Sequence, residues 1–189
     1  VESEYFEWEN QWYISLNIFW ENTSRDFKRE LEKLEEKNIE WLIIDLRDNG
    51  WGYLESAIEI LSEFIEKDKI IVTTDSKKIF WNTSYTSTNS WKTFLKPVVI
   101  IVNENSASAS EITAGALKDY NKALIIGQKT YGKWSVQQPF DIENWALLKL
   151  IIARWLTPNG ATIEWQWITP DIEVLFEKED FENKYDRQL

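Results

Sequence analysis

The chain has 189 residues and contains no cysteine and no histidine. Thiol nucleophiles, disulfides and zinc sites built from Cys or His are therefore excluded. A catalytic triad with a histidine base is excluded as well. If the chain is a hydrolase, its base must be Lys, Asp, Glu, Tyr or a bound metal, and only oxygen ligands could hold such a metal.

Long apolar runs and an excess of basic charge are also missing. No stretch of 18 consecutive apolar residues occurs, so we expect no membrane span. The net charge of −11 argues against a nucleic-acid partner, because phosphate contacts need clustered Lys and Arg. No signal peptide is visible, but the chain opens at Val1, as an excised piece would. The apolar content of 43% is enough for one packed domain.

Short apolar segments alternate along the chain with segments of helical periodicity. Strands are predicted at 12–19, 41–46, 69–74, 97–102, 122–127 and 146–156, and helices at 23–38, 54–64 and 108–121. Residues 75–96 are typical of a loop or weak hairpin, and the acidic segment after Val174 of a helical or mobile tail. The alternation predicts an α/β domain whose central sheet is mostly parallel and flanked by helices.

The strongest local signal is "NENSASASEITAGALKDY", where a buried strand runs into a loop and then a helix. Ser108 and Glu111 fit the capping-box pattern, in which the serine only satisfies free amides at the helix start. On these residues alone we favour that interpretation about two to one, since capping serines are common. The alternative is that Ser108 is a nucleophile, with the amide of Ala109 donating to an oxyanion.

A serine nucleophile needs a base, and without histidine a lysine is the natural candidate if burial keeps it neutral. Lys133 follows the apolar segment "ALIIG" and lies between Gly132 and Trp134. A solvated turn lysine is the commoner situation. Gln137 shares a strand face with Lys133 and could orient its amine.

Several segments resemble the carboxyl-terminal processing peptidases (tail-specific proteases), a serine-lysine family. Their signature reads approximately S-A-S-A-S-E-I, then A-G-A-L-x-D-Y, then G-x-x-T-x-G-K-G-x-V-Q. The matching segments here are "SASASEI" at 106–112, "AGALKDY" at 114–120, "GQKTYGKWSVQQ" at 127–138, "IIDLRDNGWG" at 43–52 and "ARWLTPNGATIEWQWITPDIEV" at 153–174. The resemblance covers nearly the whole chain in order, and it reverses the odds for Ser108.

The resemblance implies a role for each matching residue. Ser108 matches the nucleophile, Lys133 the general base and Gln137 the residue that orients the base. One oxyanion amide is implied at Ala109 and another in the turn that contains Trp51 and Gly52. Glu111 and Asp119 match acidic positions of the family motif, and we expect both to have a structural role ahead of a chemical one. For Glu111 we expect the capping-box role, and for Asp119 a hydrogen bond or ion pair at the helix end.

The resemblance also implies a fold and an activity. Residues 1–189 are expected to form a peptidase catalytic core of the ClpP/crotonase type, with 175–189 as an acidic tail and without the PDZ domain that usually precedes such a core. The implied reaction is serine endopeptidase cleavage of unfolded or C-terminally marked polypeptides, without cofactor or metal, in a bacterial setting outside the cytoplasm. Two alternatives are open: a catalytically impaired peptide-binding or scaffold relative, and a crotonase-like acyl-CoA enzyme.

The tryptophan count is unusual, with twelve Trp against six Gly. Most of these tryptophans stand where the resembled family has glycine. They are Trp51, Trp134, Trp165 and Trp167, and by our reading also Trp12, Trp20, Trp41 and Trp145. Where glycine holds a positive φ, a side chain costs about 1–2 kcal/mol. Because Trp134 adjoins the expected base, and Trp51 lies in the expected oxyanion turn, we expect impaired activity in the sequence as written.

We hypothesise that TGA encodes glycine in the source organism and was translated here as tryptophan. An aromatic ligand surface and a degenerate relative are the alternatives. Protein made in its own host is expected to have an intact mass that corresponds to glycine at most of these positions. A measured mass that matches twelve tryptophans would exclude the hypothesis.

Overall fold

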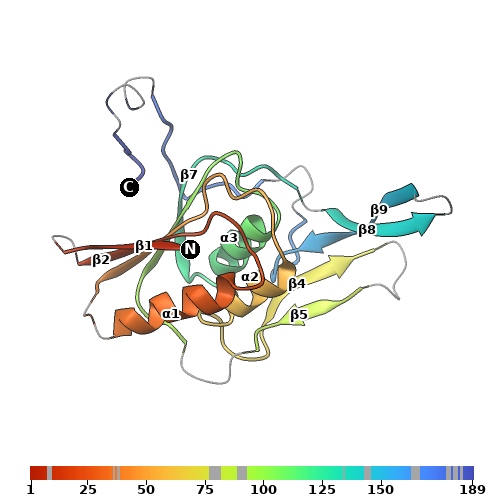
Figure 1. Cartoon of the computed structure of the whole chain (residues 1–189), viewed down its shortest axis with the longest axis horizontal. Coiled ribbons are helices and arrows are strands. Elements are labelled where there is room, and N and C mark those ends of the chain that lie inside the picture. Colours follow the sequence, from red (N-terminus) through yellow and green to blue (C-terminus); the bar gives the residue numbers. More distant parts are fainter. Residues whose placement is uncertain are drawn as a thin grey trace.

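The computed structural model describes residues 1–7, 10–35, 37, 39–76, 82–88, 93–133, 135–142, 146–162, 167–177, 180, 183 and 185–189. Its body is a six-stranded sheet of order β1-β2-β3-β6-β7-β10 (Figure 1). The strands are β1 (Glu2–Phe6), β2 (Gln11–Ser15), β3 (Trp41–Asp45), β6 (Val98–Val102), β7 (Ala123–Gly127) and β10 (Ile172–Glu173). The β1–β2 pair is antiparallel and the other described pairs are parallel, which confirms the expected architecture.

Three helices pack on this sheet, close to where the periodicity predicts them. They are α1 (Thr23–Glu35), α2 (Leu54–Leu61) and α3 (Ala109–Asp119). Phe27 and Leu31 on α1 lie one turn apart and are buried, as an amphipathic helix requires. The middle of α3 is Ala114-Gly115-Ala116, which is buried throughout, because small side chains let the helix lie deep in the core.

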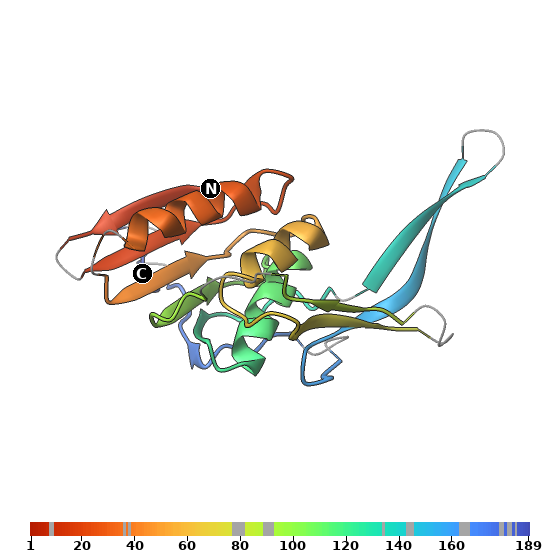
Figure 2. The same ribbon diagram turned by 90° about the horizontal axis from the view of Figure 1, so that it is seen from below.

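A second, four-stranded sheet of order β5-β4-β9-β8 adjoins the body. It consists of β4 (Ile70–Asp75), β5 (Ser84–Thr86), β8 (Ser135–Ile142) and β9 (Ala146–Leu156). All described pairs in it are antiparallel. Figure 2 shows the β8–β9 ribbon projecting away from the body. Strand β4 matches the strand predicted at 69–74. Within 75–96, where a loop or weak hairpin was expected, the described part contains β5, which pairs with β4. Strand β8 begins two residues after Lys133.

Two features were not visible in the sequence. Strand β1 has a polar, exposed run at Glu2, Ser3 and Glu4, so apolar periodicity could not reveal it. The described residues of the acidic tail are anchored on the body. The side-chain amide of Gln188 donates to the carbonyl of Val174 at 2.6 Å.

The parallel strands β3, β6 and β7 end at one edge of the main sheet, and three loops leave from there. Gly127 closes β7 with φ 118°, and a Cβ at this position would lie 2.1 Å from the Val102 carbonyl oxygen. Only glycine allows this close approach. In open α/β sheets, ligands bind beyond the carboxyl ends of the strands, so this edge is where a site is expected. Within the described part of the chain, no helix is long and apolar enough to cross a membrane.

Candidate active site

Ser108 stands at the junction between the loop after β6 and helix α3. Its backbone has φ 58° and ψ −113°, a region that non-glycine residues rarely adopt. Such strain costs about 1–3 kcal/mol and persists only where the surroundings fix the conformation, as they often do at active sites. This conformation distinguishes Ser108 from a routine helix cap, whose backbone is extended.

The two serines that flank Ser108 fasten this junction to the turn after β3. The hydroxyl of Ser106 donates to the Leu46 carbonyl at 2.8 Å. The hydroxyl of Ser110 donates to the Asn49 carbonyl at 2.8 Å, and that carbonyl also accepts the Ala107 amide at 3.0 Å. Ser106 and Ser110 are both fully buried. The turn that leads to Gly52 is therefore held in register with Ser108.

Glu111 is the central buried carboxylate of the site, with a relative exposure of 0%. One oxygen, Oε2, accepts the backbone N–H groups of Ser108 at 3.0 Å and Lys133 at 2.9 Å. The other, Oε1, accepts the Gly132 N–H at 2.7 Å and the Thr130 hydroxyl at 2.6 Å. Glu111 is thus more than a capping-box partner, because it joins the Ser108 junction to the loop that carries Lys133.

Lys133 and Gln137 lie on the segment that leads from β7 into β8. Gly132 has φ 83°, and this left-handed conformation turns the chain toward β8. Lys133, Ser135, Val136 and Gln137 all line one pocket. The register of β8 against β9 shifts between Val136 and Gln137, so the simple alternation expected for Lys133 and Gln137 on one strand face is interrupted here. The Lys133 side chain is exposed to solvent in this conformation, so the burial expected from the sequence is not present here.

A pocket of about 230 Å³ brings these parts together. Its lining includes five of the site candidates named from the sequence, one of them from the turn after β3. These are Ser108, Ala109, Lys133, Gln137 and Gly52. The N–H of Ala109 is the first of α3 and has no partner inside the helix, because the first four amides of a helix never do. Nucleophile, base and amide donor candidates therefore share one small pocket.

Of the two residues named in the turn after β3, Gly52 lines the pocket and Trp51 does not. A Cβ on Gly52 would come within 2.3 Å of the Phe19 Cβ, so the chain approaches too closely for any side chain. The Trp51 side chain is 55% exposed, is not part of the pocket lining, and meets the Trp20 ring edge-on at 6.0 Å. Trp51 could therefore contribute through its backbone only.

Arg47 ties the start of this turn to the sheet and to the tail. Its guanidinium pairs with Asp45 at 2.5 Å and with Asp186 at 2.7 Å. Burial opposes the charge, but these two carboxylates raise the pKa of Arg47. Burial and the hydrogen bond to Asp45 raise the pKa of Tyr13 to about 12. The sequence motif around Arg47 did not reveal this link to the tail.

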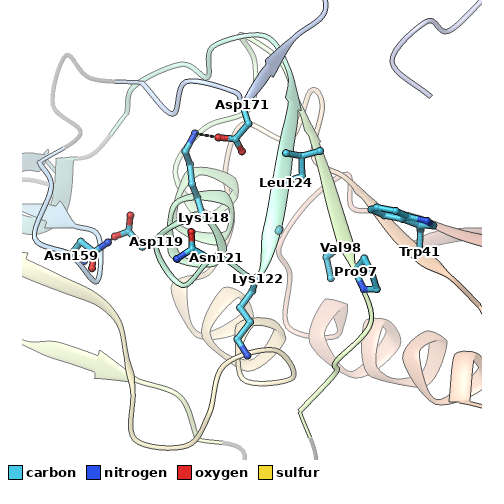
Figure 3. A pocket seen from close by; sticks show the side chains of 11 residues that line it. Trp41, Pro97, Val98, Lys118, Asp119, Asn121, Lys122, Leu124, Asn159 and Asp171 are labelled. Atoms are coloured by element: carbon cyan, nitrogen blue, oxygen red, sulfur yellow. Dashed lines mark hydrogen bonds and ion pairs between the residues drawn. The ribbon is translucent and has the colours of Figure 1, made fainter.

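Asp119 lies at the far end of α3, away from the pocket that contains Ser108. Its carboxylate accepts the Asn159 N–H at 2.9 Å. It lines a second pocket of about 680 Å³ beside Lys118, which pairs with Asp171 at 2.7 Å (Figure 3). This pocket lies at the opposite edge of the sheet, next to the start of β6 and β7. Asp119 is therefore not brought together with Ser108 or Lys133.

The backbone cost expected for tryptophan at glycine positions is not found where the structure describes these residues. None of the described tryptophans has a positive φ. Among them, Trp20 and Trp41 are surface residues and Trp12 is buried in the core, where its ring lies 5.5 Å from that of Tyr5. Trp134, Trp145 and Trp165 lie outside the described residues.

Comparison with known proteins finds a peptidase family and relatives that are named as proteases. A family model described as peptidase family S41 matches residues 11–174. The carboxy-terminal processing protease CtpB of Bacillus subtilis (strain 168) is 38% identical over 162 residues, which cover 86% of this chain and 33% of that protein. A probable CtpA-like serine protease of Staphylococcus aureus (strain N315) is also 38% identical, with 85% and 32% covered. The chain spans about a third of the length of these curated relatives.

Solved structures agree in fold. The photosystem II D1 C-terminal processing protease superimposes with a TM-score of 0.80 at 29% identity, covering 87% of this chain and 42% of that one. A putative peptidase from Parabacteroides merdae ATCC 43184 superimposes with a TM-score of 0.79 at 20% identity, covering 97% and 60%. The second likeness concerns the fold alone.

Replacing Glu111 tests whether its carboxylate holds the two loops together. In Glu111→Gln an NH₂ group takes the place of one acceptor oxygen and faces N–H donors, so at least one buried donor loses its partner. Each such loss costs about 1–3 kcal/mol. We expect a fall of that size in the free energy of unfolding, measured by urea denaturation.

Glu104→Gln is the matched control, because Glu104 is an exposed carboxylate in the loop before Ser108. It should leave the free energy of unfolding within about 0.5 kcal/mol of that of the parent chain. Equal free energies of unfolding for the two variants would show that the Glu111 carboxylate is not needed to hold the two loops together.

Proposed function

The chain belongs to peptidase family S41, and we propose that it is a serine endopeptidase in which Ser108 is the nucleophile and Lys133 the general base. The observation that carries the proposal is the shared pocket, whose lining includes Ser108, Lys133 and Gln137. The backbone N–H groups of Ser108 and Lys133 also bond to the same carboxylate oxygen, which supports a fixed relation between the two segments.

In the proposed reaction, the Ser108 hydroxyl attacks the carbonyl carbon of the scissile peptide bond while the neutral Lys133 amine takes its proton. The resulting ammonium then gives this proton to the leaving amine as the peptide bond breaks. A water molecule attacks the acyl-enzyme ester and passes a proton to Lys133, and the ester bond breaks with return of a proton to Ser108. Gln137 orients the Lys133 amine through its side-chain amide.

The oxyanion of the tetrahedral intermediate needs two donors. We assign one to the N–H of Ala109, at the positive end of the α3 dipole, and the other to the turn that contains Trp51 and Gly52. The hydrogen bonds of Ser110 and Ala107 to the Asn49 carbonyl support this assignment, because they hold that turn beside α3.

The Lys133 side chain is exposed to solvent in this structure. A polypeptide that lies across the pocket would cover this side chain and exclude water from it. The bound substrate itself would therefore complete the enclosed site in which Lys133 acts as the base.

The proposed substrates are polypeptides without stable structure, or those marked at the C-terminus. The named function of the relatives supports this class, since they are called carboxy-terminal processing or CtpA-like proteases. The resemblance to that family also supports a setting outside the cytoplasm.

Loss of the nucleophile gives the most direct test. Ser108→Ala should lower kcat/KM for hydrolysis of an unstructured protein by at least about 10³-fold, because no other group would form the acyl ester. Lys133→Met should have a comparable effect, while Lys129→Met, which changes an exposed lysine outside the pocket lining, should stay within about twofold.

Peptide fragments followed by mass spectrometry distinguish cleavage from binding. Hydrolysis that survives in Ser108→Ala would rule out the dyad. A parent chain that binds the substrate without cleaving it would instead favour a peptide-binding relative, and turnover of an acyl-CoA independent of Ser108 would favour a crotonase-like enzyme.

The tryptophans beside the site give a separate prediction for the sequence as written. The double variant Trp51→Gly/Trp134→Gly should hydrolyse the same protein faster than the parent chain. Because the Trp51 ring lies outside the pocket lining, Trp51→Gly alone should account for the smaller part of the gain. Equal rates for parent and double variant would refute the impairment.

A further inference from the structure

A cleft of about 450 Å³ lies beside the candidate active site, between the loop before α1 and the first turns of α2. Its lining combines three carboxylates, one aromatic ring and one hydroxyl, from Glu21, Tyr53, Glu55, Ser56 and Glu59. The volume is within the range of about 300–1,000 Å³ that is usual for ligand sites. None of the tryptophans at expected glycine positions belongs to this lining, but Trp20 packs against the lining residue Tyr53, with 4.8 Å between the two ring centroids.

The cleft and the candidate active site are separated by one stretch of chain. Gly52 and Leu54 line the pocket of Ser108, while Tyr53 and Glu55 line the cleft. Successive Cα atoms are about 3.8 Å apart, so the two hollows lie on opposite sides of this stretch at close range. An extended polypeptide advances about 3.3 Å per residue, so a side chain a few residues from a reacting carbonyl beside Ser108 can reach past this stretch to the cleft.

The charge of the cleft is negative and is not neutralised within the protein. Glu21, Glu55 and Glu59 are exposed, and no described Lys or Arg forms an ion pair with any of them. The Ser24 hydroxyl donates to Glu59 and leaves its charge in place. Glu55 lies in the first turn of α2. A cationic group would therefore be attracted here.

Ser56 supplies an independent indication of a ligand. It is only 4% exposed, and its Oγ has no hydrogen-bond partner in the described structure. Buried polar atoms in native proteins nearly always have a partner. A ligand that donates a hydrogen bond to this hydroxyl oxygen would satisfy it, and both ammonium and guanidinium groups are such donors.

The shape of the acidic cluster distinguishes an organic cation from a metal ion. Within the described residues, no three acidic side chains converge closely enough to hold a metal ion. The Tyr53 ring packs against Trp20, with centroids 4.8 Å apart, but is 41% exposed at the same cleft, and this exposed part offers a surface for a cation–π contact. Spread carboxylates, an open ring and a hydroxyl suit the long side chain of lysine or arginine.

We propose that this cleft is a subsite for a basic side chain of the polypeptide substrate, close to the bond that is cleaved. The proposal rests on the proposed peptidase function and adds to it a preference for Lys or Arg at one position near the scissile bond. Because the carboxylates are exposed, the preference should be moderate, about tenfold, and should weaken as salt is added.

The test uses unstructured peptides that carry one arginine at successive positions around the cleavage site, each paired with a peptide that has the neutral isostere citrulline there. At one position the parent chain should show a kcat/KM about tenfold higher for arginine. In Glu55→Gln/Glu59→Gln this ratio should fall below about twofold. Glu4→Gln/Glu32→Gln, which removes two exposed carboxylates elsewhere, should keep it.

A ratio near one at every position in the parent chain would overturn the subsite while leaving the peptidase function intact. An equal loss in both double variants would overturn it as well, since the effect would then come from overall charge. If no peptide is cleaved, the peptidase function fails, and anisotropy of labelled peptides bound to Ser108→Ala decides the subsite separately. Tighter binding of arginine than citrulline, lost only in the cleft variant, would still support it.

Discussion

The arrangement of the candidate site depends on one buried carboxylate. Glu111 is fully buried and accepts four hydrogen bonds, three of them from backbone N–H groups. An isolated buried charge is very unfavourable, so this carboxylate is tolerated only because all four donors converge on it. Each donor comes from a segment next to the pocket, and the same contacts that stabilise the charge therefore fix the Ser108 junction against the Lys133 loop.

A second constraint comes from the alternation of serines around Ser108. Side chains at 106 and 110 reach carbonyl groups of the turn after β3, and both are buried, while Ser108 lies between them at the pocket. The strained backbone of Ser108 is stabilised by these contacts on either side. Three loops from the ends of β3, β6 and β7 are thus joined by buried side chains that bond mainly to backbone groups of the neighbouring loop.

The sequence predicted the framework better than the contacts within it. Strands β3, β6 and β7 are short apolar runs, and α3 begins at a recognisable capping box, so each could be located without coordinates. Strand β1 could not, because its first three residues are polar, and its position is visible only from its antiparallel pairing with β2. The bonds from Glu111 to residues 130–133 span about twenty positions, and two of the three donors are backbone N–H groups, which leave no trace in the side-chain pattern. The anchoring of the tail by Arg47 was missed for a related reason, since the charges that meet there are far apart in the chain.

For the tryptophans, the expectation from the sequence pattern differs from the backbone conformation in the structure. Their positions suggested backbone strain, yet the described ones adopt ordinary backbone angles, so their presence is compatible with the fold. Trp12 does show a local cost, because its indole N–H is buried without a partner, which is worth about 1–3 kcal/mol. Against this, its ring fills space in the core and contacts Tyr5. The glycine hypothesis therefore rests on the repeated substitution itself. Trp51 belongs to neither the Ser108 pocket nor the acidic cleft, whereas Trp20 packs against Tyr53 at the edge of the cleft.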